Sequence, residues 1–270
     1  MRDNTLNRDQ AVQHWNTIRD AIQKIYAQKA SQLSYEELYR TAYNLVLHKH
    51  GEMLYDNVRK TTVEMLQPIT QKLTSIPDED LVREINEIWE LEKYVIIMIK
   101  DILLYMDKNF VPKMKNFLNV EAMQTNQFKT HVVQNSQIKK RLTHLLLAEI
   151  EKERNGEMVE RQNIQKCIQM LIEVGLQSKR IYEQEFEAPL IDQTRDYYRN
   201  ESNTFISQNS CNAYLIKANT RLQEEQDRVN SYLHTSSMDK IINEFLKEYI
   251  ESHAQTLLTM ENSGLIQMIK

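Results

Sequence analysis

Residues 33–55 read LSYEELYRTAYNLVLHKHGEMLY, and this stretch carries the local signals of a helix. Ser34 and Glu37 have the spacing of a capping box, in which each side chain satisfies the backbone N–H of the other residue. Leu33 and Leu38 occupy the two positions of a hydrophobic staple. From Leu38 onward, apolar residues recur at helical spacing. The stretch therefore predicts an amphipathic helix that begins just after Ser34.

The same spacing of three and four residues recurs along the chain, at 15–25, 138–150 and 238–260. No strict heptad is kept, so packing in a globular helical array is favoured over a two-stranded coiled coil. The chain has only four glycines and four prolines, well below the roughly 12% of an average protein. We expect the prolines to mark helix boundaries; they are Pro68, Pro77, Pro112 and Pro189. The predicted fold is all-α, an elongated stack of helices, and excludes β-rich and dinucleotide-binding folds.

The charge balance argues against nucleic-acid and membrane partners. The net charge is −4, without the basic excess that most phosphate-binding domains carry. The most apolar run, residues 94–106, is shorter than the ~20 residues of a membrane span and predicts a helix buried on most of its surface.

Cys167 and Cys211 have no nearby partner and are interpreted as small buried residues in a reducing compartment.

The sequence contains no motif that predicts a catalytic residue, a cofactor or a metal site. His48 and His50 would lie about 200° apart on a helix and could not share a metal. Glutamates alternate with basic residues at 149–154 and 224–228, which is typical of a solvated, charged helix face.

Tyrosine is unusually common, with 13 residues against six phenylalanines. Tyr35, Tyr39 and Tyr43 follow one another at intervals of four, on the flank of an apolar stripe that starts at Leu38. Such a row is either a structural rim with hydroxyls in water or the anchor of a protein interface. Spacing alone leaves both interpretations open.

Residues 33–55 resemble the second helix and following turn of the cullins, most closely of the cullin-3 type. Further segments of the chain resemble cullins in the same order, at 98–107, 151–161, 182–190 and 260–265. The resemblance implies a stack of cullin repeats, each a five-helix bundle. Repeat 1, which binds the adaptor, would cover 1–135, repeat 2 would cover 136–250, and a truncated repeat 3 would begin at 251–270.

The resemblance implies a non-catalytic scaffold of a RING-type E3 ubiquitin ligase. Cullins of this type hold BTB-domain substrate adaptors at the N-terminal repeats and a RING-box protein near the C-terminus, where a ubiquitin-like modifier is attached. These 270 residues contain no region resembling that C-terminal part, so we expect binding without ubiquitin transfer. A dimeric BTB protein would create a 2:2 assembly, and the expected location is the cytoplasm and nucleus. The alternatives are a cullin with a Skp1-like adaptor and an unrelated helical-repeat tethering protein.

Matching positions imply which residues contact the adaptor; these are Leu33, Ser34, Tyr35, Glu36, Tyr39 and Tyr43 on the second helix and Tyr105 and Lys108 on the fifth. The chain departs from the cullin-3 pattern in three places. Tyr35 replaces phenylalanine, Lys108 replaces arginine, and the segment 2–8 is polar where an apolar contact segment is usual.

Overall fold

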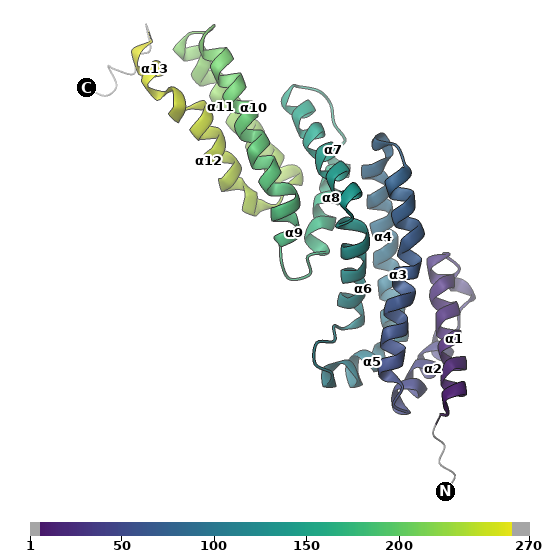
Figure 1. Ribbon diagram of the computed structural model, residues 1–270. Helices are drawn as coiled ribbons and strands as arrows, with labels where there is room; N and C mark the ends of the chain where they lie inside the picture. The colour runs from purple at the N-terminus through teal and green to yellow at the C-terminus, as the bar shows by residue number, and fades with distance from the viewer. Residues whose placement is uncertain (1–5, 261–270) are drawn as a thin grey trace. The chain divides into compact units, whose positions relative to one another are not determined.

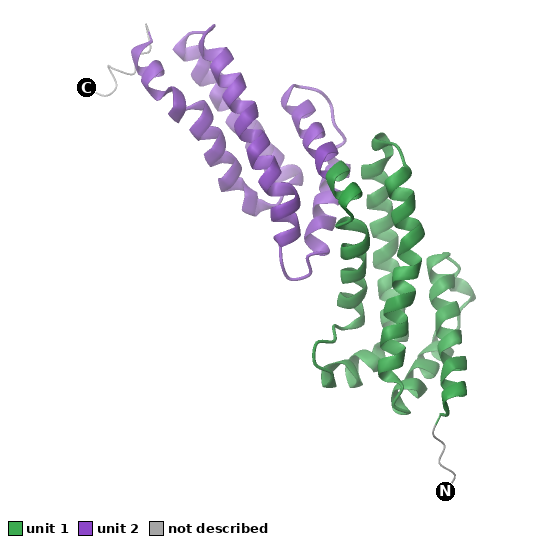
Figure 2. Ribbon diagram, in the orientation of Figure 1, with its two compact units in different colours: residues 1–142 green, residues 143–270 purple. Residues whose placement is uncertain are grey.

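The computed structural model describes residues 6–260, and every regular element within that range is a helix (Figure 1). The chain divides into two compact units after Leu142, inside helix α7 (Figure 2). The sequence placed the end of its first repeat seven residues earlier, at 135, and the assignment of each unit to a cullin repeat stays a prediction.

Unit 1 ends at Leu142, and its described part contains six helices before α7. They are α1 (Arg8–Tyr26), α2 (Tyr35–Leu47), α3 (Gly51–Ser75), α4 (Asp78–Ile102), α5 (Leu104–Asn109) and α6 (Val120–Phe128). Short 3-10 turns η1 (Ala30–Gln32) and η2 (Val111–Lys113) and a π-helical turn η3 (Lys129–Val133) join them. Helix α7 (Ser136–Arg154) follows.

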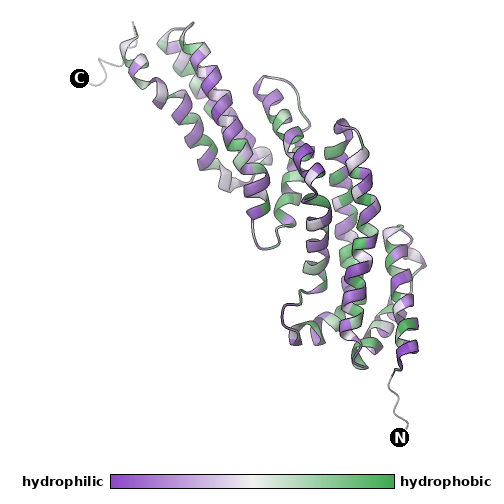
Figure 3. Ribbon diagram, in the orientation of Figure 1, coloured by the Kyte–Doolittle hydropathy of each residue, from purple (hydrophilic) through white to green (hydrophobic). Residues whose placement is uncertain are grey.

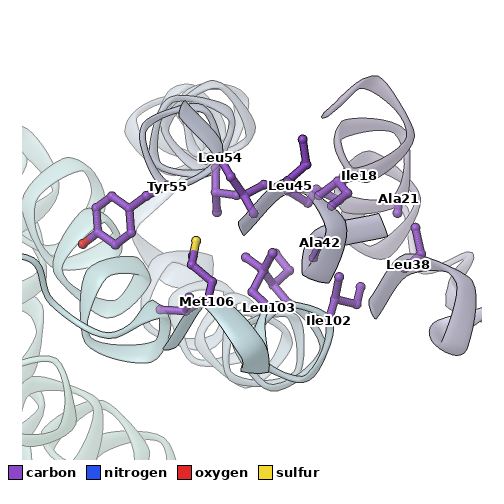
Figure 4. Close-up of a cluster of buried hydrophobic side chains, with 14 of the residues drawn as sticks. Ile18, Ala21, Leu38, Ala42, Leu45, Leu54, Tyr55, Ile102, Leu103 and Met106 are labelled. Atoms are coloured by element: carbon purple, nitrogen blue, oxygen red, sulfur yellow. The ribbon is translucent and has the colours of Figure 1, made fainter. Parts of the chain in front are cut away.

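The core of unit 1 forms where α1, α2, α3 and the α4–α5 segment meet (Figure 4). Leu38, Ala42 and Leu45 of α2 are buried there, as the helical spacing predicted. The stripe at 15–25 is likewise buried along α1. Burial of aliphatic side chains is the main stabilising contribution to such a core. It contributes ~25 cal/mol for each Å² of apolar surface removed from water.

Unit 2 runs from Thr143, and its described part contains the end of α7 and the helices that follow. They are α8 (Arg161–Glu173), α9 (Arg180–Tyr182), α10 (Ala188–Ile206), α11 (Cys211–Tyr232), α12 (Met238–Tyr249) and α13 (Ala254–Thr259). The π turn η4 (Glu183–Glu187) and the 3-10 turns η5 (Thr235–Ser237) and η6 (Glu251–His253) connect them. The stripe predicted over 238–260 is therefore interrupted at η6.

Two predicted helix signals are wrong. Ser34 does sit at the N-cap of α2, but its side chain accepts no capping hydrogen bond; Ser34, Glu36 and Glu37 in this first turn are exposed, so their backbone N–H groups do not depend on a side-chain cap. A reciprocal capping box forms instead between Asn7 and Gln10 at the start of α1. Pro68 lies inside α3 rather than at a boundary.

The position of Pro68 has a physical reason. Proline removes one backbone donor, and its ring clashes with the carbonyl four residues earlier, so a helix that continues through it needs support from packing. Thr70, two residues later, donates its hydroxyl to the carbonyls of Leu66 (3.0 Å) and His131 (3.2 Å). The latter bond ties this part of α3 to η3, so packing within unit 1 holds the helix through the proline.

The prediction of solvated charged faces is also wrong at three positions. Arg154, Glu225 and Arg228 are buried, and together they form ion pairs of 2.9 and 2.5 Å centred on the Glu225 carboxylate. The alternation of acidic and basic residues along a sequence indicates charge pairs on one helix. It does not show whether another helix covers those charges. Here α7 and α11 bring residues 71 positions apart into contact.

Hydrophilic and hydrophobic residues alternate along the helices (Figure 3). Among residues 6–260, no helix has an apolar stretch long enough to cross a membrane. Cys167 and Cys211 are both buried and unpaired, which confirms their interpretation as small core residues. The polar segment 2–8, which departs from the cullin-3 pattern, and the predicted third repeat at 251–270 lie partly outside the described residues.

Candidate functional site

Helix α2 presents the three tyrosines, hereafter the tyrosine row (Tyr35, Tyr39 and Tyr43), on the flank of its buried stripe. Leu38 and Ala42 alternate with the row and are buried, which fixes the rotation of the helix. Tyr39 is consequently 37% exposed, whereas Tyr35 and Tyr43 are partly buried. The row is thus neither a core element nor a set of fully solvated side chains.

Helix α5 lies beside α2 and brings Tyr105 to the row. The Tyr43 and Tyr105 ring centroids are 4.4 Å apart, and the ring planes are tilted by 59°. Such a tilted contact between aromatic rings is favourable, because the positive edge of one ring meets the negative face of the other. Two predicted site residues from distant parts of the sequence therefore meet.

Burial on the opposite side of α5 holds this helix in place. Met106 is fully buried, and Asp107 accepts a hydrogen bond from the Val120 backbone N–H at 2.8 Å. Phe110 at the end of α5 packs onto Gly51, where a Cβ atom would lie only 2.6 Å from the Phe110 ring. Only glycine at position 51 allows this close approach without a shift of the ring.

Tyr35 makes its hydrogen bond within its own chain. Its hydroxyl donates to Met98 Sδ of α4 at 3.3 Å. Partial burial raises the pKa of Tyr35 above its usual value, and the nearby Tyr94 and Asp101 raise this pKa further. The ring packs against the core of unit 1, so Tyr35 links α2 to α4 as well as lining the surface.

The remaining predicted site residues lie at the edges of this surface. Leu33 is partly buried against the core, whereas Ser34 and Lys108 are exposed. Glu36 is exposed and forms an ion pair with Arg40, one turn away, at 2.8 Å. The adaptor-contact role of all eight residues stays a prediction.

Sequence reasoning missed three exposed apolar residues near the row. Leu47 continues the interval of four from Tyr43 and is 51% exposed. Tyr94 and Ile97 of α4 are 47% and 57% exposed, although the run 94–106 was expected to be mostly buried. Their signal was the same helical spacing, but an apolar run with few charges does not show which of its faces another helix covers.

No group of three His, Cys, Asp or Glu side chains that could hold a metal ion occurs among residues 6–260. The arrangement therefore offers aromatic and apolar surface with a few charges at its edge. Surfaces rich in tyrosine with a polar edge are typical of protein interfaces.

The sequence matches the family model described as the cullin alpha solenoid domain over residues 15–270. It is similar to cullin-3 of Dictyostelium discoideum, with 41% identity over 95% of this chain and 33% of that protein. It is also similar to cullin-3A of Arabidopsis thaliana, with 38% identity over 94% of this chain and 34% of that protein. Identity to human cullin-4A is 26%, over 90% of this chain and 32% of that protein.

An all-helical fold and a family match over nearly the whole chain define the class: this chain belongs to the cullin family. Within the family, its resemblance is to the cullin-3 type. The chain spans about a third of the length of the curated relatives it matches.

Proposed function

We propose that this chain is a scaffold segment of a cullin-RING E3 ubiquitin ligase and that it binds BTB-domain substrate adaptors through α2 and α5. The observation that carries the proposal is the contact of Tyr43 with Tyr105, which joins two helices into one aromatic surface next to the exposed Tyr39. Similarity to cullin-3 proteins supports the choice of adaptor class.

The physical role of the tyrosine row follows from its partial burial. Tyrosine has few rotatable bonds, so a half-packed ring loses little conformational entropy when a partner covers it. The Tyr39 and Tyr43 rings supply apolar contact area, and their hydroxyls supply hydrogen-bonding groups at the edge. Tyr35 contributes its ring edge, since its hydroxyl already has Met98 as partner.

The segment acts by binding and spacing rather than by catalysis. In a longer protein, it would hold the substrate adaptor at a distance from a C-terminal region that binds a RING-box protein and carries a ubiquitin-like modifier. A BTB protein that is itself a dimer would recruit two copies in a 2:2 assembly. Such a complex would work in the cytoplasm and the nucleus.

Calorimetric titration of the 270-residue protein with recombinant BTB domains tests the proposal. We expect saturable binding that weakens by about 2 kcal/mol or more in Tyr39→Ala or Tyr43→Ala, because hot-spot tyrosines contribute at this level. Lys217→Ala, a change at a partly exposed position of α11 in unit 2, serves as the control and should bind like the wild type. Preferential binding of a Skp1-like adaptor, or unchanged affinity in both tyrosine variants, would contradict the proposal.

A further inference from the structure

Helix α4 turns two large apolar side chains, Tyr94 and Ile97, toward solvent; we call them the α4 patch. Large apolar side chains that are exposed singly need no explanation, but grouped ones often mark interaction sites. In the described part of unit 1, six large apolar residues are exposed, and four of them lie on α2 and α4: Tyr39, Leu47, Tyr94 and Ile97. These two helices pack against each other.

The α4 patch is continuous with the tyrosine row. Met98, adjacent to Ile97, accepts the hydrogen bond of Tyr35, and Tyr94 lies close enough to raise the pKa of Tyr35. Tyr35 meets Met98 and Tyr43 meets Tyr105, so α2 and the α4–α5 segment run in the same direction. The α4 patch precedes Met98 and therefore extends the surface beyond the first turn of α2.

Two side chains cannot form a stable interface by themselves, since specific complexes bury roughly 800 Å² on each partner. The α4 patch is therefore more readily explained as an extension of a larger contact than as a separate docking site. The tyrosine row is the apolar surface that it extends.

We propose that the α4 patch is a second contact for the same BTB adaptor, and that it selects among adaptors; this inference rests on the proposed function. The matching adaptor presents an apolar surface next to the residue that covers Tyr35. An adaptor with an acidic residue there is disfavoured, because it would bring a second negative charge near the exposed Asp101.

Calorimetry on the 270-residue protein tests this inference with Tyr94→Gln, Ile97→Gln and the double variant. Glutamine is a good helix former, so these exposed positions should retain the fold, which thermal unfolding checks. Ile216→Gln is the matched control, since Ile216 of α11 is 61% exposed and Ile97 is 57% exposed. With the tightest-binding BTB domain of a panel, we expect at least a tenfold weaker Kd for the double variant and less than a twofold change for the control.

The outcomes separate this inference from the proposed function. A double variant that binds like the wild type, while Tyr39→Ala weakens binding, overturns the second contact and leaves the proposed function standing. If the double variant and Tyr39→Ala both bind like the wild type, the second contact and the proposed function are both wrong. If sedimentation shows a wild-type dimer that Ile97→Lys converts to a monomer, then the α4 patch contacts a second copy of this chain, and the inference is wrong.

Discussion

The two units place most of their tyrosines differently, although Tyr55 of unit 1 is buried and Tyr197 of unit 2 is only partly buried. In unit 1, Tyr35, Tyr39, Tyr43, Tyr94 and Tyr105 are exposed or partly buried. In unit 2, five tyrosines are almost completely buried; they are Tyr182, Tyr198, Tyr214, Tyr232 and Tyr249. Most tyrosines of unit 1 therefore contribute to its surface, whereas most tyrosines of unit 2 contribute to its interior.

Two of the buried tyrosines of unit 2, Tyr198 and Tyr232, bond to carboxylates of a charged network. Glu225 accepts hydrogen bonds from Arg154 (2.9 Å), Arg228 (2.5 Å) and the Tyr198 hydroxyl. The Arg154 guanidinium also lies 5.4 Å from the centroid of the Tyr198 ring. Burial alone would raise the pKa of Glu225, but the two guanidinium groups more than offset this effect and hold the pKa below its usual value.

Unit 1 has a buried carboxylate of the opposite kind. Glu92 of α4 accepts a hydrogen bond from the Tyr26 hydroxyl at 3.0 Å, and burial raises the pKa of Glu92 to about 7. A neutral hydroxyl compensates the burial of a carboxylate charge much less than two guanidinium groups do. The two units therefore differ in how they tolerate a buried acid as well as in where they place tyrosine.

Removing one of the two cations from the network should give the largest effect. Arg154→Ala leaves the Glu225 carboxylate buried with one fewer guanidinium, and such changes cost about 3–5 kcal/mol in the free energy of unfolding. Chemical denaturation of the variant measures this loss. Arg199→Ala is the control, because Arg199 pairs with Glu248 at 3.0 Å but is half exposed, and its loss of stability should be much smaller. Equal effects in the two variants would contradict the network's role.

The acid in unit 1 predicts a pH dependence of stability. Glu92 binds a proton more tightly in the folded state than in the unfolded state, so its contribution is complete below pH ~4.5 and is lost as the pH rises to about 7. The full loss approaches about 3 kcal/mol. Denaturation between pH 4.5 and 7.5 should show a flatter profile for Glu92→Gln than for the wild type. Glu90→Gln, an exposed change on the same helix, should leave the wild-type profile intact.

A matched pair of hydroxyl deletions gives the smallest effects and compares the two kinds of tyrosine directly. Tyr198→Phe removes a donor to the buried Glu225 carboxylate and should cost about 1–3 kcal/mol in unfolding free energy. Tyr39→Phe removes a hydroxyl on an exposed side chain and should change stability by less than about 0.5 kcal/mol. If the two deletions were equally costly, the distinction between interior and surface tyrosines would fail.

Sequence reasoning predicted the helical class and the burial of several stripes, because helical spacing depends only on the local chain. Leu38, Ala42 and Leu45 were read correctly in this way. It failed where a distant helix decides the outcome. Arg154 and Glu225 look like solvated charges until α7 and α11 meet, and Ile97 looks like core until α4 is seen to leave that face uncovered.

The candidate site could likewise be predicted only as far as local spacing determines it. The interval of four in the tyrosine row gave its place on the flank of α2, but spacing could not choose between a rim and an interface. Resemblance to the cullins supplied Tyr105, and the structure brings it to Tyr43. Tyr94 was missed because neither its spacing nor the quoted resemblance marks it as exposed.

Hydroxyl-radical footprinting of the protein with and without a BTB domain tests whether the surface of α2 and α4 binds the adaptor. In the free protein, Tyr39 and Tyr94 should be oxidised readily, whereas Tyr198 and Tyr214 should resist, as their burial dictates. Met158 is fully exposed in unit 2 and provides the internal control. We expect the adaptor to protect Tyr39 and Tyr94 and to leave Met158 unchanged. Protection confined to unit 2, or none at Tyr39, would contradict this expectation.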